Sequence, residues 1–497
     1  MHKHPKHRRA RSTQPSNHRS AKKTAPRKPR PCRDTQFDQV LRDDGGGFLT
    51  LLRERIGWEE LNGLNQRKHR AGRPAHILNR GQLLAGLIFH CTVSLAGSFG
   101  EHLFWLLGIQ MAESTLSERR QTLPFEVFTD LLKRMLRPIV GASQSAYYRG
   151  LHLVAIDGVS FSLPNTEQVK GKCKKGGNQR GRAAFAKLQC AALVELVMHN
   201  PLAAMLGWQG ESEWKLAQGL LDHLPEKCLL LADRLYGCGA FIAAALEVLQ
   251  QRQGHFLFRV KHGLKILRRL RRFKDGSQLV QIHALDPSNH HRVIATMEVR
   301  EIRATIRRRG HRPVQIRLWT SLNCAQGSAQ ELVSLYMSRW EQELYFRELK
   351  SQLGINDLLR SQTPETAAQE VATMIIGTSL IAHERAKLKP GEQLQHRISF
   401  IKTWETLEPL WLTLLLGADI LTEKQKEQLC ERFYNLAARR VMAKKRSRSC
   451  PRAMRQTTQP WPRKKNQKSS EGPLDISICS THSCRMKNYR MELGFSR

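Results

Sequence analysis

Acidic residues are scarce in this sequence. Its 497 residues include 43 Asp and Glu against 81 Lys and Arg, so the formal net charge is +38. Such an excess bears on partners more than on fold, and it indicates a polyanion, of which nucleic acid is the first candidate. An anionic membrane surface is the weaker alternative, because no strongly amphipathic helix with one apolar and one basic face stands out.

The sequence also lacks a long apolar run. The stretch Gly81–Gly100 is free of Asp, Glu, Lys and Arg, but it contains Gln82, His90 and four glycines. A buried helix is therefore expected there, and no membrane span. The basic N-terminus is not followed by an apolar segment, so no secretory signal is expected.

Paired cysteine motifs are absent as well. The eleven cysteines are scattered singly along the chain, and no CxxC pair occurs. This spacing argues against a zinc ribbon, and reduced thiols in the cytoplasm are the default expectation.

Composition divides the chain into a body and two basic ends. The length predicts two to four domains, and a hydrophobic fraction of 40% is enough for a sizeable core. Residues 1–35 are expected to form a disordered basic arm, and residues 439–497 a disordered basic tail. Ends that only aid solubility are the alternative. Residues 36–145 have the Leu and aromatic spacing of helices, so an all-helical N-terminal domain is predicted.

The middle of the chain alternates between strand-like and helix-like patterns. Short apolar runs such as Leu151–Ile156 and Cys228–Ala232 predict strands, and helical segments separate them. This alternation predicts an α/β core, with its first part at residues 146–260. Residues 261–318 carry turn signals and β-branched segments and are predicted to be a β-rich insertion. Residues 319–438 then supply the rest of the core and C-terminal helices.

Two aspartates directly follow apolar strands of the predicted core. Asp157 ends the first run and Asp233 ends Cys228–Ala232. Ligands bind at the carboxyl ends of strands in open α/β sheets, so both are candidate site residues. Ordinary strand termination explains either one equally well.

A predicted long helix, Ala329–Leu353, adds a third acid. Tyr336, Arg339, Glu343 and Lys350 lie within about 60° of one another on one helical face, at about 100° per residue. A solvated face with an Arg339–Glu343 ion pair is the alternative. Glu341 and Glu348 lie on other faces and are expected to be surface acids.

Three carboxylates around one point can hold two divalent cations. Such sites serve in-line displacement at phosphorus, and hard oxygen ligands favour Mg²⁺, with Mn²⁺ as a substitute. The basic residues on the same helix face would then contact phosphate oxygens.

The spacing Tyr336-x2-Arg339-x3-Glu343-x6-Lys350 resembles the signature of DDE transposases of the insertion-sequence-four family, which are encoded by bacterial insertion sequences. LVAIDG at Leu153–Gly158 and LLLADRLY at Leu229–Tyr236 are similar to the family's first two catalytic blocks. The opening of a helix at Ser212-Glu213 is also similar. The resemblance covers roughly residues 40–430.

The resemblance implies a ribonuclease-H-like core in which Asp157, Asp233 and Glu343 are the catalytic and metal-binding residues. It implies that the helical N-terminal domain binds DNA. Tyr336, Arg339, Lys350 and Arg234 are the implied DNA-binding residues. A stacking tryptophan is expected in the insertion, where Trp319 lies late and is left unassigned.

The implied activity is cut-and-paste DNA transposition. Members cleave double-stranded DNA at terminal inverted repeats with two Mg²⁺ ions and join the ends to target DNA, acting as a homodimer. A cytoplasmic, nucleoid-associated protein is therefore expected. The alternatives are a catalytically inactive or domesticated DNA-binding relative, and a structural RNA-associated basic protein. The last gives no reason for the ordered carboxylate blocks.

Overall fold

The computed structural model describes the body of the chain. The described residues are 47–56, 78, 80–139, 147–178, 181–208, 210–289, 291–306, 314–351, 358–388 and 398–442. The predicted arm at 1–35, and all but the first four residues of the predicted tail at 439–497, lie outside them. No helix in the described part of the chain is both long and apolar enough to span a membrane.

A large mixed sheet forms the centre of the fold. Its strands follow the order β6-β5-β2-β7-β8-β12-β11-β10-β9, with short β1 paired to β2. The strands are β1 (Tyr147–Tyr148), β2 (Leu151–Ser162), β5 (Lys187–Glu195), β6 (Asn200–Gly207), β7 (Cys228–Ala232), β8 (His255–Arg259), β9 (Arg268–Arg272), β10 (Gln278–Leu285), β11 (Val293–Ile306) and β12 (Val314–Thr320). β2, β7 and β8 are parallel, and the remaining pairings are antiparallel. The mixed α/β class expected from the sequence is confirmed.

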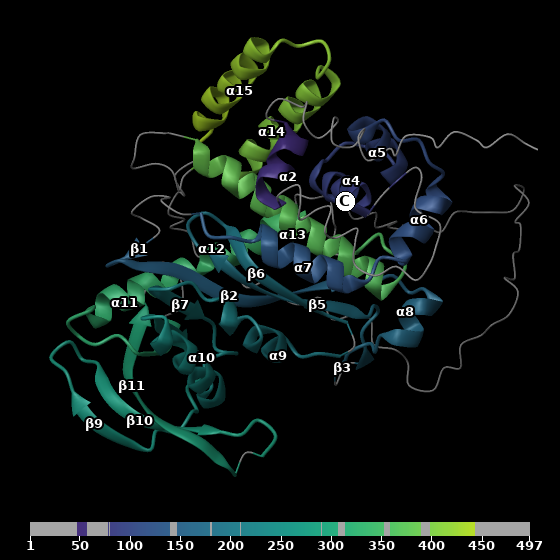
Figure 1. The fold of residues 1–497 in the computed structure, drawn as a ribbon. Coiled ribbons are helices and arrows are strands. Elements are labelled where there is room, and N and C mark those ends of the chain that lie inside the picture. Colours follow the sequence, from purple (N-terminus) through teal and green to yellow (C-terminus); the bar gives the residue numbers. More distant parts are fainter. Residues whose placement is uncertain are drawn as a thin grey trace, which may run out of the picture. The chain divides into compact units, whose positions relative to one another are not determined.

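Helices cover both faces of this sheet, as Figure 1 shows. Val154 and Ile156 of β2 share a core with α9 (Glu213–Gln218) and α10 (Gly239–Gln251). Leu153 and Ala155 point the other way and share a core with α11 (Ala329–Tyr336). Because successive strand residues alternate between faces, Asp157 belongs to the α11 side and Gly158 to the α9 side.

The helical layer above the sheet is organised around α13 (Pro364–Lys387). Thr363 caps α13 with a reciprocal hydrogen-bond pair, Pro364 begins it, and nearly every residue as far as Arg385 is buried. α13 packs against β6 and against two N-terminal helices, α4 (Arg80–Thr92) and α7 (Phe125–Met135). Residues of these three helices belong to one hydrophobic core. The remaining helices are α2 (Phe48–Ile56), α5 (Phe99–Leu107), α6 (Glu113–Gln121), α8 (Glu167–Lys172), α12 (Trp340–Ser351), α14 (Phe400–Leu416) and α15 (Glu423–Ala438).

Two local expectations are wrong. The first strand does not end at Asp157: it pairs with β5 as far as Ser162 opposite Lys187, so Asp157 lies inside β2. The long helix at 329–353 is interrupted by a 3₁₀ turn, Met337–Arg339, between α11 and α12. The buried helix expected within Gly81–Gly100 is present as α4, which ends at Thr92, and Ser98 then caps the separate helix α5.

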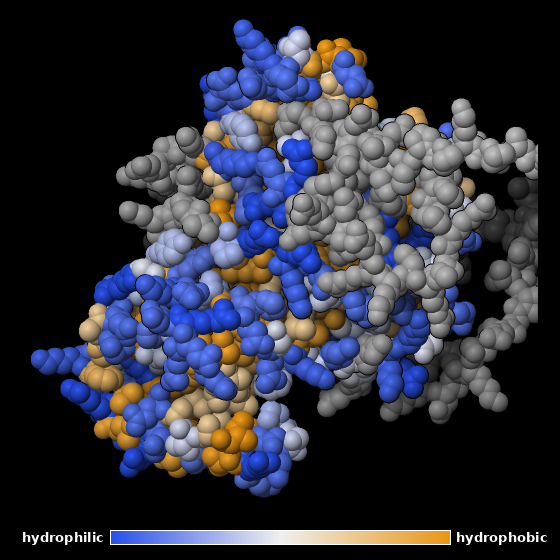
Figure 2. Space-filling view, viewed as in Figure 1, coloured by the Kyte–Doolittle hydropathy of each residue, from blue (hydrophilic) through white to orange (hydrophobic). Residues whose placement is uncertain are grey.

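The strands of the predicted insertion, 261–318, extend the central sheet. β12 pairs with β8, and β11, β10 and β9 follow outward. Figure 2 shows a mostly hydrophilic surface on the visible face, with hydrophobic residues grouped over these outer strands. Leu285, Val293 and Ile294, at the far end of the β10–β11 hairpin, are among the exposed apolar side chains.

Candidate functional site

The strand register brings the two predicted aspartates together. β2 and β7 run parallel and pair as far as Ile156 beside Ala232. Asp157 and Asp233 are the next residue on each strand. Neighbouring strands lie about 4.8 Å apart, so the two residues stand side by side where β7 ends and β2 continues.

Asp157 is held in place by two donors. Its Oδ1 accepts a hydrogen bond of 2.9 Å from the backbone N–H of Gly158, and its Oδ2 lies 3.2 Å from Arg339 Nη1. Burial raises the pKa of Asp157 to about 7. The negative charges of Asp233 and Glu213 also raise this pKa, whereas the Gly158 N–H and Arg339 lower it. The carboxylates of Asp233 and Glu213 thus add negative charge near Asp157, on which Arg339 also acts.

Asp233 shapes the turn that follows β7. Its Oδ1 accepts a hydrogen bond of 2.7 Å from the N–H of Leu235, and its carbonyl accepts one of 3.3 Å from the N–H of Tyr236. The side chain of Arg234, in the same turn, is exposed. The turn thus presents Arg234 to solvent beside Asp233.

Arg339 joins the α11–α12 junction to the strand. Its Nη2 lies 2.5 Å from Glu343 Oε1, so one guanidinium bridges Glu343 and Asp157. Tyr336, at the end of α11, is buried beside it, and burial raises its pKa to about 12. The 3₁₀ turn brings Arg339 towards β2 while Glu343 remains one turn away on α12.

Lys350 extends this row along α12. Its Nζ lies 5.4 Å from the ring centroid of Phe161, which is on β2 four residues beyond Asp157. These contacts line up four side chains along one side of β2: Asp157, Arg339, Glu343 and Lys350. Trp319, by contrast, is buried and donates a hydrogen bond of 3.0 Å to Glu301.

The donor set at the site suits a divalent cation. Asp157, Asp233 and Glu343 offer only carboxylate oxygens, which hard cations such as Mg²⁺ prefer. In this conformation Arg339 supplies the positive charge between two of them. Among the described residues, no group of three or more His, Cys, Asp or Glu side chains converges as metal ligands do. The three carboxylates fit a divalent cation by their chemistry, and the Arg339 guanidinium lies between two of them.

One acid near the site was not a sequence candidate. Glu213, at the start of α9, lies against Gly158 and accepts a hydrogen bond of 2.8 Å from the Tyr236 hydroxyl. The Ser212-Glu213 helix start is visible in the sequence, but the contact with β2 depends on the fold.

Glu341 and Glu348 are not the simple surface acids expected from their helical faces. His199, in the β5–β6 turn, lies 3.1 Å from Glu341 through Nε2 and 2.6 Å from Glu348 through Nδ1. Burial alone would lower the pKa of His199, but the two carboxylates outweigh it and raise the pKa. The His199 imidazole therefore links the β5–β6 turn to α12, the helix that carries Glu343.

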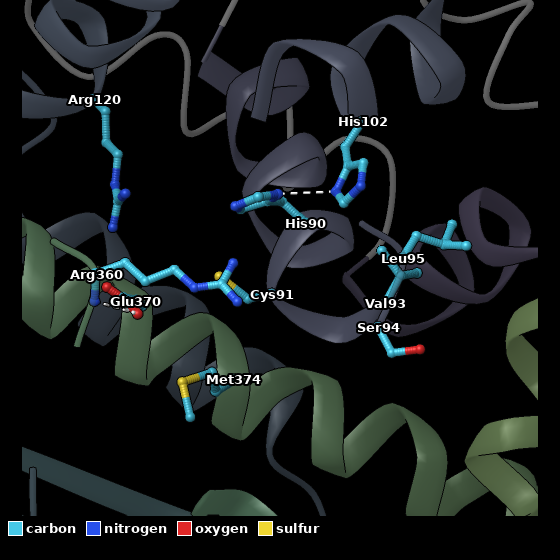
Figure 3. A pocket seen from close by; sticks show the side chains of 10 residues that line it. All are labelled: His90, Cys91, Val93, Ser94, Leu95, His102, Arg120, Arg360, Glu370 and Met374. Atoms are coloured by element: carbon cyan, nitrogen blue, oxygen red, sulfur yellow. Dashed lines mark hydrogen bonds between the residues drawn. The ribbon is translucent and has the colours of Figure 1, made fainter. Parts of the chain in front are cut away.

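A small cavity of about 110 Å³ lies among the N-terminal helices and α13, and Figure 3 shows its lining. His90 and His102 share a hydrogen bond of 2.9 Å. Burial, His102, Arg120 and Arg360 lower the pKa of His90 to about 3, so its ring is neutral near pH 7. Arg120, Arg360 and the acid Glu370 also line the cavity, and none of the predicted site residues does.

Comparison with known proteins relates this chain to transposases. Residues 149–379 match the family model described as a transposase DDE domain, a span that includes Asp157, Asp233 and Glu343. The chain is 25% identical over 361 residues to the transposase InsG for insertion sequence element IS4 of Escherichia coli (strain K12), covering 71% of this chain and 78% of that protein.

A solved structure also aligns with the chain. It is the cryo-EM structure of a piggyBac transposase synaptic complex with hairpin DNA, with a TM-score of 0.37 and 10% identity over 78% of this chain and 85% of that one. The family match and the relative bear out the resemblance of the three sequence blocks to DDE transposases of the insertion-sequence-four family.

Proposed function

We propose that this protein carries out cut-and-paste transposition: it binds the terminal inverted repeats of an insertion sequence, cleaves the DNA there and joins the ends to target DNA. The observation that carries the proposal is the register of β2 and β7. It sets Asp157 beside Asp233, while Arg339 connects Asp157 to Glu343.

In this proposal the chain's own residues divide into two groups. Asp157, Asp233 and Glu343 hold two Mg²⁺ ions, which when bound activate the attacking oxygen and stabilise the leaving oxygen. Arg339 and Lys350, on the same side of β2, hold the phosphates of the transposon end, with Tyr336 beside them and Arg234 reaching from the β7 turn.

The wider architecture is consistent with this assignment. The order β6-β5-β2-β7-β8, antiparallel at one side and parallel at the other, supports a ribonuclease-H-like core. The same proposal includes domain boundaries at 145, 260, 318 and 438. It also includes a homodimer that holds paired ends, and a nucleoid-associated location in the cytoplasm.

Cleavage of matched DNA tests the function. DNA carrying the ends that flank this gene is incubated with Mn²⁺ beside a scrambled duplex, and binding is followed by gel shift. We expect nicking at the end sequence by the wild-type protein and none by Glu343→Gln, which should still bind. Glu226→Gln, which changes an exposed acid before β7, is the matched control and should cleave normally.

Two results would overturn the proposal. Equal nicking of the end duplex and the scrambled duplex would show that the protein does not recognise the ends. Specific binding without cleavage by the wild-type protein would identify the chain as an inactive DNA-binding relative.

A further inference from the structure

Glu213 occupies the side of β2 opposite Asp157. Gly158 has no side chain, and a Cβ placed there would overlap the carboxyl group of Glu213. Asp157 and Gly158 point to opposite faces of the sheet, so Asp157 faces α12 while Glu213 closes the other face. The glycine after the first aspartate thus makes room for this second acid.

Tyr236 connects Glu213 to the other aspartate. Its ring is fully buried, and its hydroxyl donates the 2.8 Å hydrogen bond to Glu213 Oε1. Burial raises the pKa of Tyr236 far above its usual value, with the charge of Glu213 adding to it, so the hydroxyl remains a donor. Tyr236 also closes the turn that begins at Asp233, because its N–H bonds to the Asp233 carbonyl.

The carboxyl end of the Glu213 side chain therefore makes two contacts with the framework of the site. Its carboxyl group lies against β2 next to Asp157, and its acceptor oxygen holds the turn that carries Asp233. A hydrogen bond from a neutral donor to a partly buried carboxylate is stronger than one between neutral groups, because the acceptor is charged. Loss of this bond would leave the Asp233 turn held by its local hydrogen bonds and by the packing of the Tyr236 ring.

We propose that Glu213 is a positioning residue that, through the Tyr236 hydroxyl, fixes the distance between Asp233 and Asp157 and so sets the affinity of the pair for a divalent cation. This inference rests on the proposed function, since that function assigns cation binding to the two aspartates. Glu213 acts through Tyr236 and contacts no substrate.

Binding of Mn²⁺ to the DNA-free full-length protein, followed by electron paramagnetic resonance, tests the proposal without any cleavage step. Partners that orient metal ligands are typically worth about 10- to 100-fold in affinity. We expect Glu213→Ala and Tyr236→Phe each to weaken Mn²⁺ binding about tenfold. Glu213→Gln keeps an acceptor for the tyrosine hydroxyl and should restore most of that loss.

The double variant Glu213→Ala/Tyr236→Phe should bind Mn²⁺ no more weakly than either single variant, because both remove one shared interaction. Glu226→Gln, with the same loss of charge at an exposed position, should equal the wild type. Thermal unfolding of each variant confirms that a folded protein is being compared.

Three outcomes would overturn the proposal. Wild-type Mn²⁺ affinity in Glu213→Ala would show that the residue does not set the site. Equal losses in Glu213→Gln and Glu213→Ala would show that charge acts, and that the hydrogen bond does not. If Asp157→Asn also leaves Mn²⁺ binding unchanged, the cation site is wrong, and the proposed function and this inference both fall.

Discussion

At the scale of single residues, Arg339 has two roles in this account: it pairs with carboxylates, and it is proposed to bind a DNA phosphate. It is nearly buried and pairs with both Asp157 and Glu343, yet the proposed function also gives it a DNA phosphate. A guanidinium cannot serve both partners fully, so phosphate binding would release the carboxylates. DNA binding and cation binding are then coupled, and each should strengthen the other by the same factor.

Removal of this guanidinium should separate the two effects. We expect Arg339→Ala to raise the Mn²⁺ affinity of the DNA-free protein about fivefold, or ~1 kcal/mol, because two carboxylates lose their positive partner. The same variant should bind and cleave end DNA less well. Titration of Mn²⁺ with and without end DNA measures both quantities. An Mn²⁺ affinity that falls in Arg339→Ala would contradict the exchange.

Sequence reasoning reached some of these residues and not others, for physical reasons. Asp157 and Asp233 were found because both follow apolar runs that form adjacent strands. Glu213 was not selected, because a contact across β2 leaves no periodic signal. Glu348 was expected at the surface, since helical spacing reveals a helix face but not the His199 that comes from a distant turn to cover it.

At the scale of elements, the position of α12 depends on the β5–β6 turn. His199 has a backbone φ of 49°, an uncommon value for a residue with a side chain, and it bonds to both Glu341 and Glu348. Arg385 of α13 also faces this group and opposes its charge. The clamp therefore joins α12 to the β5–β6 turn, and Arg385 donates hydrogen bonds to two carbonyls of the same turn.

This clamp predicts a pH-dependent stability. The pKa of His199 is raised in the folded protein, so its stabilisation is complete below the unfolded value of about 6.5 and is lost as pH rises through the folded value. We expect the free energy of unfolding in urea to fall more steeply in the wild type than in His199→Gln as the pH rises above about 6.5. Identical slopes in the two proteins would show that the imidazolium does not hold α12.

The elements also show where pattern reading stops. The Asp157-Gly158 pair is typical of a turn, yet pairing with β5 carries the strand on to Ser162. The 3₁₀ turn at Met337–Arg339 leaves the apolar spacing almost unchanged, so a single helix was expected. With both differences, Arg339 still pairs with Asp157 and with Glu343.

At the scale of the whole molecule, the charge of +38 remains the strongest guide to the partner. A polycation binds DNA by releasing counterions from phosphates, which makes affinity fall steeply with salt. The basic N-terminal residues lie outside the described structure, and their composition alone assigns them to this general attraction.

Deletion of residues 1–34 should therefore reduce non-specific affinity more than end recognition. We expect a shallower dependence of binding on salt concentration, with the preference for end DNA over scrambled DNA retained. Gel shifts at several salt concentrations with both duplexes measure the two effects. If the end preference disappears together with the arm, recognition lies in the arm and the assignment of the arm to general attraction is wrong.

The central claim is that Asp157, Asp233 and Glu343 form one catalytic centre. Its most direct measurement is the Mn²⁺-dependent nicking rate of Asp157→Asn, Asp233→Asn and Glu343→Gln, each compared with the wild type at equal occupancy of end DNA. We predict that the rate of every one of the three falls by about a thousandfold or more, because each loses a carboxylate of the same centre. Nicking at the wild-type rate by any of them would contradict the claim.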